Sequence, residues 1–331
     1  MSFDPDAPGE GGLFGLPFSP ENARILVQAV PWQATTSYRR GTREGPAALV
    51  EASLQVDLFD LQYGEFWREG IALLDEDPSF REWDADAEAD ALAVIESLGR
   101  DPAAAARVNA LSEQVNAAVY ARTRETLAAG RIPALLGGDH SAPFGAMRAV
   151  AERFPGVGVL HVDAHADLRD AYEGFTWSHA SILFNVLRHI PGVSRVAQVG
   201  IRDFGEAEAR LIDAEPRLRT WFDAAVGERL AAGETWLSLV DEIIEALPAQ
   251  VYVTFDVDGM DPALCPGTGT PVPGGLSWRD TQVLLKRLSE RRHIVGFDLN
   301  EIGPGEWDGN VAARLLYKLC GAAIRSQPAQ K

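Results

Sequence analysis

The segment between residues 157 and 170, VGVLHVDAHADLRD, constrains the fold of this chain more than any other stretch. An apolar, β-branched run leads directly into Asp163, His165 and Asp167, which stand at alternating positions. In extended backbone, alternate side chains point to one side of the strand and lie roughly 6–7 Å apart. Burying three ionisable groups is costly unless they are paired or bound to a metal. The pattern therefore predicts a buried strand that ends in a metal-binding cluster; the alternative interpretation is a solvated acidic loop.

Strands and helices alternate along most of the chain. Short apolar runs predict strands at residues 23–30, 70–74, 132–136, 193–200, 250–255 and 293–299, in addition to the run before Asp163. Helical periodicity predicts helices at residues 47–56, 85–98, 102–129, 142–154, 178–190, 205–213, 235–247, 277–289 and 311–325. This alternation is typical of α/β proteins, in which helices cover both faces of a mainly parallel sheet. We expect one domain over residues 20–331, preceded by a mobile, Gly- and Pro-rich arm at residues 1–19.

Composition excludes several classes of function. The formal net charge of −18 argues against a surface that binds nucleic acid or anionic membranes, and it suits a cationic small ligand. No apolar run reaches the roughly 18 residues of a membrane span, and the N-terminal residues lack the basic and apolar regions of a signal peptide. The only two cysteines, Cys265 and Cys320, provide no disulfide framework and fit a reducing compartment. We therefore expect a cytoplasmic enzyme.

Three further motifs follow predicted strands. They are GGDHS at residues 137–141, DVDGMD at residues 256–261 and NEIG at residues 300–303. Open α/β sheets place their ligand sites at the carboxyl ends of the strands, so these motifs are expected to meet the DAHAD segment there. Two alternatives exist for single motifs. The first motif could be a tight turn with an incidental His140, and the second resembles the DxDG loop of aspartate-nucleophile phosphatases, a reading that leaves the other motifs unexplained.

The pooled motifs provide a mixed set of imidazole and carboxylate ligands. The six candidate metal ligands are His140, Asp163, His165, Asp167, Asp256 and Asp258. Such a set suits Mn, Fe, Ni or Zn rather than Ca or Mg, and the lack of cysteine argues against structural zinc. Six ligand residues exceed the needs of one catalytic metal with open positions. We therefore predict a two-metal site that lowers the pKa of a bound water.

These motifs, in this order, resemble those of the ureohydrolase family of arginases and agmatinases. The likeness extends to TTSYRRGTREGPAALVEAS, GTGTPVPGGLSWRD and DLNEIGP, and thus covers most of the chain. The resemblance implies a three-layer arginase-like fold with the metal site at the carboxyl ends of the strands. It also implies that Asp163 and Asp256 are shared between two metals. One metal would add His140 and Asp167 to these two carboxylates, and the other would add His165 and Asp258.

The same resemblance implies roles for residues around the metals. His179, in the segment SHAS, would transfer protons and contact the substrate, and Glu301 would pair with a guanidinium group. Asp167 would also carry protons, and Asp258 would stabilise the tetrahedral intermediate. Substrate contacts are further expected from the loops that hold Thr36, Trp177 and Trp278, with Tyr172 as another aromatic residue at the rim. The family pattern gives His161 no role, and we expect it to be structural.

The implied reaction is hydrolysis of a small cationic guanidino compound to urea and an amine. The Asn-x-His-Gly element of arginases is absent, which disfavours arginine. Agmatine, hydrolysed to putrescine, is therefore the first candidate, followed by free guanidine with nickel, and then by guanidinobutyrate or formimidoylglutamate. The resemblance implies two divalent ions per subunit, Mn²⁺ or Ni²⁺, and a homotrimer or homohexamer. A metal-dependent deacetylase and an inactive regulatory relative are the competing classes.

Overall fold

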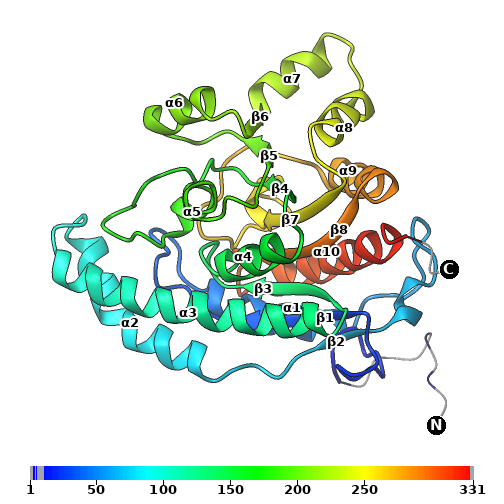
Figure 1. Cartoon of the computed structure of the whole chain (residues 1–331), viewed down its shortest axis with the longest axis horizontal. Helices are drawn as coiled ribbons and strands as arrows, with labels where there is room; N and C mark the ends of the chain where they lie inside the picture. The colour runs from blue at the N-terminus through cyan, green and yellow to red at the C-terminus, as the bar shows by residue number, and fades with distance from the viewer. Residues whose placement is uncertain (1–2, 4, 6–10, 329–331) are drawn as a thin grey trace.

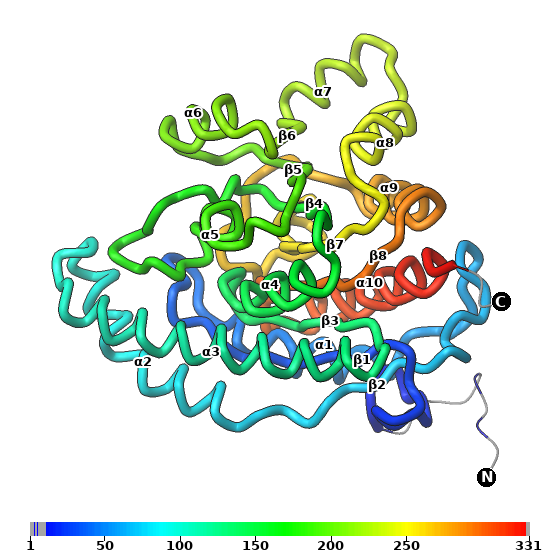
Figure 2. Tube along the Cα trace, viewed as in Figure 1, coloured from blue at the N-terminus to red at the C-terminus, as the bar shows by residue number. Residues whose placement is uncertain are grey.

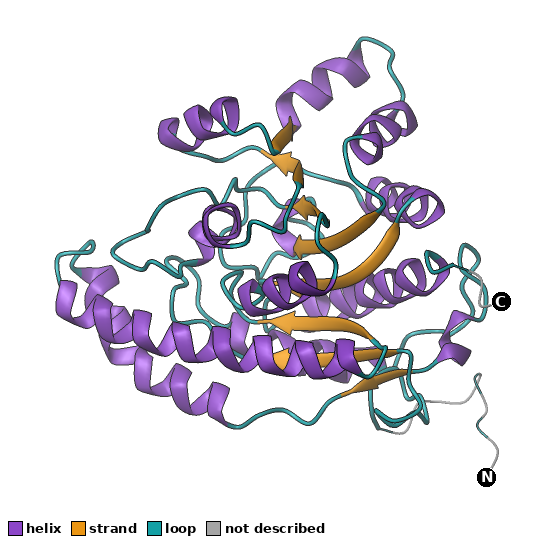
Figure 3. Ribbon diagram, in the orientation of Figure 1, coloured by secondary structure: helices purple, strands orange, loops and turns teal. Residues whose placement is uncertain are grey.

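The computed structural model describes residues 3, 5 and 11–328 and contains an eight-stranded, all-parallel sheet (Figures 1 and 3). The strand order is β2-β1-β3-β8-β7-β4-β5-β6. The strands are β1 (Ile25–Val30), β2 (Ile71–Leu73), β3 (Ile132–Gly137), β4 (Gly158–Val162), β5 (Arg195–Ile201), β6 (Leu218–Phe222), β7 (Gln250–Asp256) and β8 (His293–Asn300). The last strand, β8, thus lies between β7, the strand before it in sequence, and β3, which comes from the first half of the chain (Figure 2).

Ten α-helices accompany the sheet in the described part of the chain. They are α1 (Gly45–Ser53), α2 (Ser79–Glu96), α3 (Pro102–Ala128), α4 (Phe144–Arg153), α5 (Ile182–His189), α6 (Glu206–Ala214), α7 (Asp223–Ala231), α8 (Trp236–Glu245), α9 (Trp278–Arg291) and α10 (Glu306–Arg325). Helices α2 to α5 contribute to one apolar cluster, and α1, α8, α9 and α10 contribute to another (Figure 1). The molecule therefore has three layers.

The central strands are apolar throughout because both faces of the sheet are covered. In β4, Val159 packs into the cluster formed by α2 to α5, whereas its neighbour Leu160 packs into the cluster on the opposite face. In β7, Tyr252 likewise packs into the cluster formed by α2 to α5, and Val253 packs into the cluster on the opposite face. Alternate residues of a strand point to opposite faces, so a doubly covered strand needs an uninterrupted apolar run. This is the pattern from which these strands were predicted.

Two predictions about the chain require correction. A mobile arm does not fit residues 13–16, because Leu13, Phe14 and Leu16 are buried in the core and the Phe14 N–H donates to Ser53 Oγ. Most of residues 1–10 lie outside the described part. The sequence also gave no sign of β6 and α7. Strand β6 is an edge strand with an exposed Arg219, so it lacks an apolar run. No helix among the described residues is long and apolar enough to span a bilayer.

Candidate metal centre and substrate cavity

The six candidate metal ligands and Glu301 come from the four middle strands of the sheet. Each of β3, β8, β7 and β4 delivers its motif just beyond its carboxyl end, where parallel strands finish at one edge. The close packing there requires glycine at position 138, since a Cβ on Gly138 would lie 2.0 Å from the carbonyl oxygen of Trp32. Five of the six candidate ligands are buried, and His165 is partly exposed.

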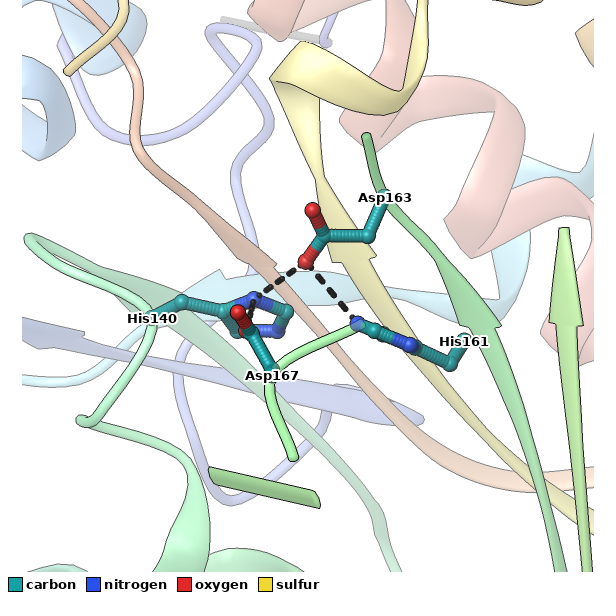
Figure 4. Close-up of side chains that lie close together, drawn as sticks. All are labelled: His140, His161, Asp163 and Asp167. Atoms are coloured by element: carbon teal, nitrogen blue, oxygen red, sulfur yellow. Dashed lines mark hydrogen bonds and ion pairs between the residues drawn. The ribbon is translucent and has the colours of Figure 1, made fainter. Parts of the chain in front are cut away.

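One group of side chains surrounds His140. Its Nδ1 atom lies 2.9 Å from Asp163 Oδ2, 3.2 Å from Asp167 Oδ2 and 3.4 Å from Asp256 Oδ2. Figure 4 shows the His140 ring pointing toward Asp163 and Asp167. The structure thus brings together the four residues expected around one metal.

A second group lies beside the first and shares Asp163 with it. His165 Nδ1 lies 3.1 Å from Asp258 Oδ2 and 3.4 Å from Asp163 Oδ1. The carboxylate of Asp163 therefore faces His165 with Oδ1 and His140 with Oδ2. The ligand atoms of Asp163, His165 and Asp258 all lie within 4.8 Å of one another, as do those of His140, His161, Asp163 and Asp167. Asp256 connects to this second group through its Oδ1 atom, which accepts the Asp258 N–H at 2.8 Å.

The electrostatics of the cluster fit bound cations. Burial, followed by the charges of Asp258 and Asp163, raises the pKa of Asp256 well above its usual range. Burial and the charge of Asp163 raise the pKa of Asp167 to about 7. Carboxylates crowded together in a buried site resist ionisation unless positive charge is supplied. Imidazole nitrogens and carboxylate oxygens are a donor set that suits divalent first-row metals, so these residues fit such ions.

Removing divalent cations is expected to lower thermal stability. A ligand that binds only the folded state at 100 times its Kd stabilises that state by about 2.7 kcal/mol. We expect the melting temperature to fall after chelation and to recover when Mn²⁺ or Ni²⁺ is restored. Differential scanning calorimetry of the chelated and reloaded protein measures this, with Mg²⁺ as the control ion. Identical melting curves with and without Mn²⁺ or Ni²⁺ would argue against a metal site.

A buried chain of hydrogen bonds fixes the orientation of His140. Its Nε2 atom lies 2.9 Å from Thr254 Oγ1, whose hydroxyl donates to Asp298 Oδ1 at 2.8 Å. Because the hydroxyl proton is used for Asp298, Thr254 accepts from Nε2–H. The proton of neutral His140 thus sits on Nε2, and the lone pair on Nδ1 faces the carboxylates. Such outer hydrogen bonds commonly set the tautomer of a metal-binding histidine.

Two of the site residues have unusual backbone conformations. Asp167 has φ 55° and Glu301 has φ 60°, in the left-handed region that side chains other than glycine rarely adopt. Strain of this kind persists where surrounding contacts over-determine the backbone, and it concentrates at functional sites. The backbone here holds both carboxylates in place at the ends of β4 and β8.

The sequence interpretation missed the contact made by His161. Its Nε2 lies 2.8 Å from Asp163 Oδ2, and its Nδ1 lies 3.1 Å from Gln198 Nε2, which also donates to the carbonyl of Ala166. A carbonyl can only accept, so the Gln198 amide presents N–H groups to both partners. His161 therefore accepts at Nδ1 and donates from Nε2 to Asp163. The alternation of residues 161, 163, 165 and 167 was the signal that could have found it.

His161 leads to a prediction about pH. Burial lowers its pKa below the usual 6.5, so the unfolded chain takes up a proton that the folded protein resists. Its contribution to stability is complete above pH 6.5 and is lost as the pH falls, by at most about 1.4 kcal/mol per pH unit. We expect His161→Gln, which keeps an N–H donor, to flatten the pH dependence. Urea unfolding of both proteins between pH 5 and 7.5 measures it; equal slopes would contradict the prediction.

A cavity of about 250 Å³ opens onto the candidate metal centre. It is lined by Ser37, Tyr38, His165, Asp167, Arg169, Tyr172, His179, Ala180, Asp203, Glu208, Thr270, Pro271 and Val272. Three expected site residues, His165, Asp167 and His179, thus lie on its wall. Tyr172 meets the His179 ring edge-on, with centroids 5.9 Å apart. The cavity gives a small molecule access to both His179 and the metal ligands.

Glu301 and Thr36 are buried, and both border Gly269, the residue before the cavity-lining Thr270. Glu301 Oε1 accepts the His140 N–H at 2.9 Å, whereas Glu301 Oε2 and Thr36 Oγ1 have no partner among the described residues. A Cβ on Gly269 would lie 2.7 Å from that free oxygen of Glu301 and 3.6 Å from Thr36 Cγ2, so both residues border one glycine. Burial and the charge of Asp139 raise the pKa of Glu301 well above its usual range. A cationic group would satisfy this carboxylate.

Two aromatic residues expected at the rim lie elsewhere. The half-buried Trp177 packs against Phe144 and His189, with ring centroids 4.8 and 5.7 Å away, and it is not among the residues that line the cavity. Trp278 begins α9 and packs against the core on the other face of the sheet. Both indoles are thus half-buried against these neighbours, and neither lines the cavity. Tyr172 alone of the three lies on the cavity wall.

Comparisons with known proteins agree with this geometry. The model of the Arginase family matches residues 23–324. The chain is 33% identical over 313 residues to N(1)-aminopropylagmatine ureohydrolase of Thermus thermophilus, which covers 93% of this chain and 94% of that protein. It is 28% identical to agmatinase of Pyrococcus horikoshii, covering 92% and 94% of the two chains. The crystal structure of agmatine ureohydrolase of Thermoplasma volcanium matches with a TM-score of 0.72 and 27% identity over 93% of this chain and 92% of that one.

The family match spans most of the chain, and the fold agrees with the solved relatives. The sequence interpretation of family and fold is confirmed. This chain belongs to the arginase family, the ureohydrolases.

Proposed function

We propose that this protein hydrolyses the guanidino group of a small cation to urea and an amine, with two Mn²⁺ or Ni²⁺ ions. One observation carries the proposal. The buried Oε2 of Glu301, which has no partner among the described residues, borders Gly269 next to the cavity-lining Thr270, and the ring of His179 lines the same cavity together with the candidate ligands His165 and Asp167. The arrangement combines an acceptor for a planar cation, a proton carrier and a metal-binding cluster.

Each residue of the candidate site has a chemical task in this proposal. Glu301 Oε2 accepts an N–H of the guanidinium group and holds the carbon of that group toward the cluster. The pKa of His179 is lowered by burial, which keeps its ring neutral and able to move a proton at neutral pH. When bound, the two cations supply positive charge and lower the pKa of a water molecule at the site. His140, Asp163, His165, Asp167, Asp256 and Asp258 would hold them.

The cavity favours a guanidino-alkylamine over free guanidine. Asp203 is exposed on the cavity wall, and no basic side chain of the described residues lies within 4 Å of it. Its carboxylate suits the distal ammonium of a substrate such as agmatine or aminopropylagmatine, the compounds for which the relatives are named. The neighbouring Arg169 is already 3.5 Å from Glu208, which reduces its attraction for a substrate carboxylate.

The test is urea release from a panel of substrates. The metal-free protein is reloaded separately with Mn²⁺ and Ni²⁺ and offered agmatine, N(1)-aminopropylagmatine, guanidine, guanidinobutyrate and arginine. Turnover of agmatine or its aminopropyl derivative supports the proposal, and their ratio decides between them. Turnover of guanidine alone, fastest with Ni²⁺, would replace the proposed substrate with free guanidine. No urea from any compound, despite bound metal, would overturn the proposed function.

A further inference from the structure

A buried hydrogen-bond chain connects Asp139 to the candidate proton carrier through a threonine hydroxyl. Thr35 Oγ1 donates to Asp139 Oδ2 at 2.8 Å and lies 3.3 Å from His179 Nδ1. The backbone N–H of His179 also donates to Thr35 Oγ1, at 3.0 Å. Thr35 and Asp139 are fully buried, and neither belongs to the proposed metal ligands or substrate contacts. The hydroxyl thus contacts both the backbone and the ring of His179.

The direction of these hydrogen bonds follows from the partners of Asp139. Its carboxylate accepts four bonds, from the N–H and the hydroxyl of Thr35 and from the N–H and the hydroxyl of Ser141. The single hydroxyl proton of Thr35 is therefore committed to Asp139. Toward the imidazole, Thr35 Oγ1 can only accept, so a proton on His179 Nδ1 is the arrangement that makes a bond. Two lone pairs would face each other in the other tautomer.

We propose that Thr35 is a positioning residue that keeps the proton of His179 on Nδ1 and so leaves the Nε2 lone pair for the substrate. The inference rests on the proposed function of His179. No described residue hydrogen-bonds to Nε2, and His179 lines the cavity. Asp139 contributes indirectly, because it accepts the proton of the Thr35 hydroxyl and so orients that hydroxyl. If the proton were on Nε2 instead, the His179 ring would present an N–H, and not a lone pair, to the cavity.

A second hydroxyl near the ring provides a point of comparison. Ser178 Oγ lies 3.4 Å from His179 Nδ1 and accepts the Ala180 N–H at 3.2 Å. Nothing else in the described structure commits its proton, so it can donate or accept and cannot select a tautomer. The constraint therefore comes from Thr35, whose proton is engaged elsewhere.

The test compares Thr35→Val, which keeps the shape and removes the hydroxyl, with Thr35→Ser, which keeps the hydroxyl. Proton transfer by a positioned side chain contributes roughly 10²–10⁴-fold, so we expect T35V to lower kcat by about 10- to 100-fold. We expect KM and metal content to stay near the wild-type values and T35S to recover most of kcat. Thr42→Val is the matched control, because Thr42 is a buried threonine in the same segment between β1 and α1, and its hydroxyl has no partner among the described residues.

A double variant separates an effect through His179 from general damage. If Thr35 acts through that ring, T35V causes no further loss in a His179→Asn background. Three outcomes would overturn the inference: full activity of T35V, equal damage in T35S and T35V, or the same fold-loss from T35V with and without His179.

A spectroscopic measurement keeps the inference testable if the proposed function fails. Long-range ¹H–¹⁵N spectra of the Zn²⁺-loaded protein, with His179 assigned by its absence in H179N, report the tautomer directly. We expect Nδ1–H in the wild type and in T35S, and a shifted mixture in T35V. Nε2–H in the wild type would contradict the inference whatever the substrate panel shows.

Discussion

Replacing Asp163 with asparagine is expected to abolish both metal binding and hydrolysis. The two oxygens of Asp163 face His140 and His165, so one substitution affects both halves of the candidate metal centre. Losing an outer-shell partner alone commonly lowers metal affinity or activity by about 10- to 100-fold. The loss of a shared ligand should therefore exceed about 100-fold. Metal content by inductively coupled plasma mass spectrometry and urea release measure the two effects.

The control for Asp163→Asn is a buried carboxylate outside the site. Asp60 is buried, accepts the N–H groups of Gln62 and Tyr63 through Oδ1 and pairs with Lys318 at 2.6 Å. Asp60→Asn keeps the accepting oxygen, so it tests the loss of a buried charge without touching the cluster. We expect it to retain metal and activity. An Asp163→Asn protein with two bound ions and substantial turnover would refute the assignment of Asp163 as a shared ligand.

Replacing Glu301 with glutamine is expected to remove activity while leaving the metal in place. The glutamine carbonyl can still accept the His140 N–H, but its amide would present N–H groups to a guanidinium that also carries only N–H groups. Removing one partner of a buried charge pair costs about 2–5 kcal/mol, which corresponds to a loss in kcat/KM on the order of 10²–10³-fold.

Steady-state kinetics and metal analysis of Glu301→Gln distinguish substrate binding from site assembly. Wild-type metal content with a collapsed kcat/KM supports a substrate role for Glu301. Glu301→Asp, which keeps the charge on a shorter side chain, should lose less. Loss of metal in Glu301→Gln would instead assign the residue to the support of His140, and unchanged kinetics would exclude it from the site.

Much of the fold and the metal cluster could be predicted because their signals are local. Strand β4 and its DAHAD motif occupy ten consecutive residues, and the alternation of their side chains follows from extended backbone alone. Strand β6 gave no such signal, since an edge strand is only partly covered and carries an exposed Arg219. The buried segment at residues 13–16 was hidden among the glycines and prolines around it.

The remaining features of the site depend on contacts between distant segments. Asp139 meets Thr35 across 104 residues, and His179 meets Thr35 across 144, so no local pattern reports either bond. Trp177 was expected at the rim because the loop that holds it was expected there. The direction of its side chain, however, is set by contacts with Phe144 and His189. The direction of a side chain thus depends on packing that the sequence pattern does not report.

The position of β8 has a consequence for the biosynthesis of the protein. The ribosome makes this strand last, yet it joins the block β2-β1-β3, which carries His140, to the block β7-β4-β5-β6, which carries the other metal ligands. Until β8 enters, the two blocks have no strand between them, so we expect His140 to stay apart from the other five candidate ligands, which lie at or just after the ends of the directly paired strands β4 and β7. We therefore expect a chain truncated before β8 to lack the His140 half of the candidate metal centre, so that complete metal loading requires synthesis at least through Asn300.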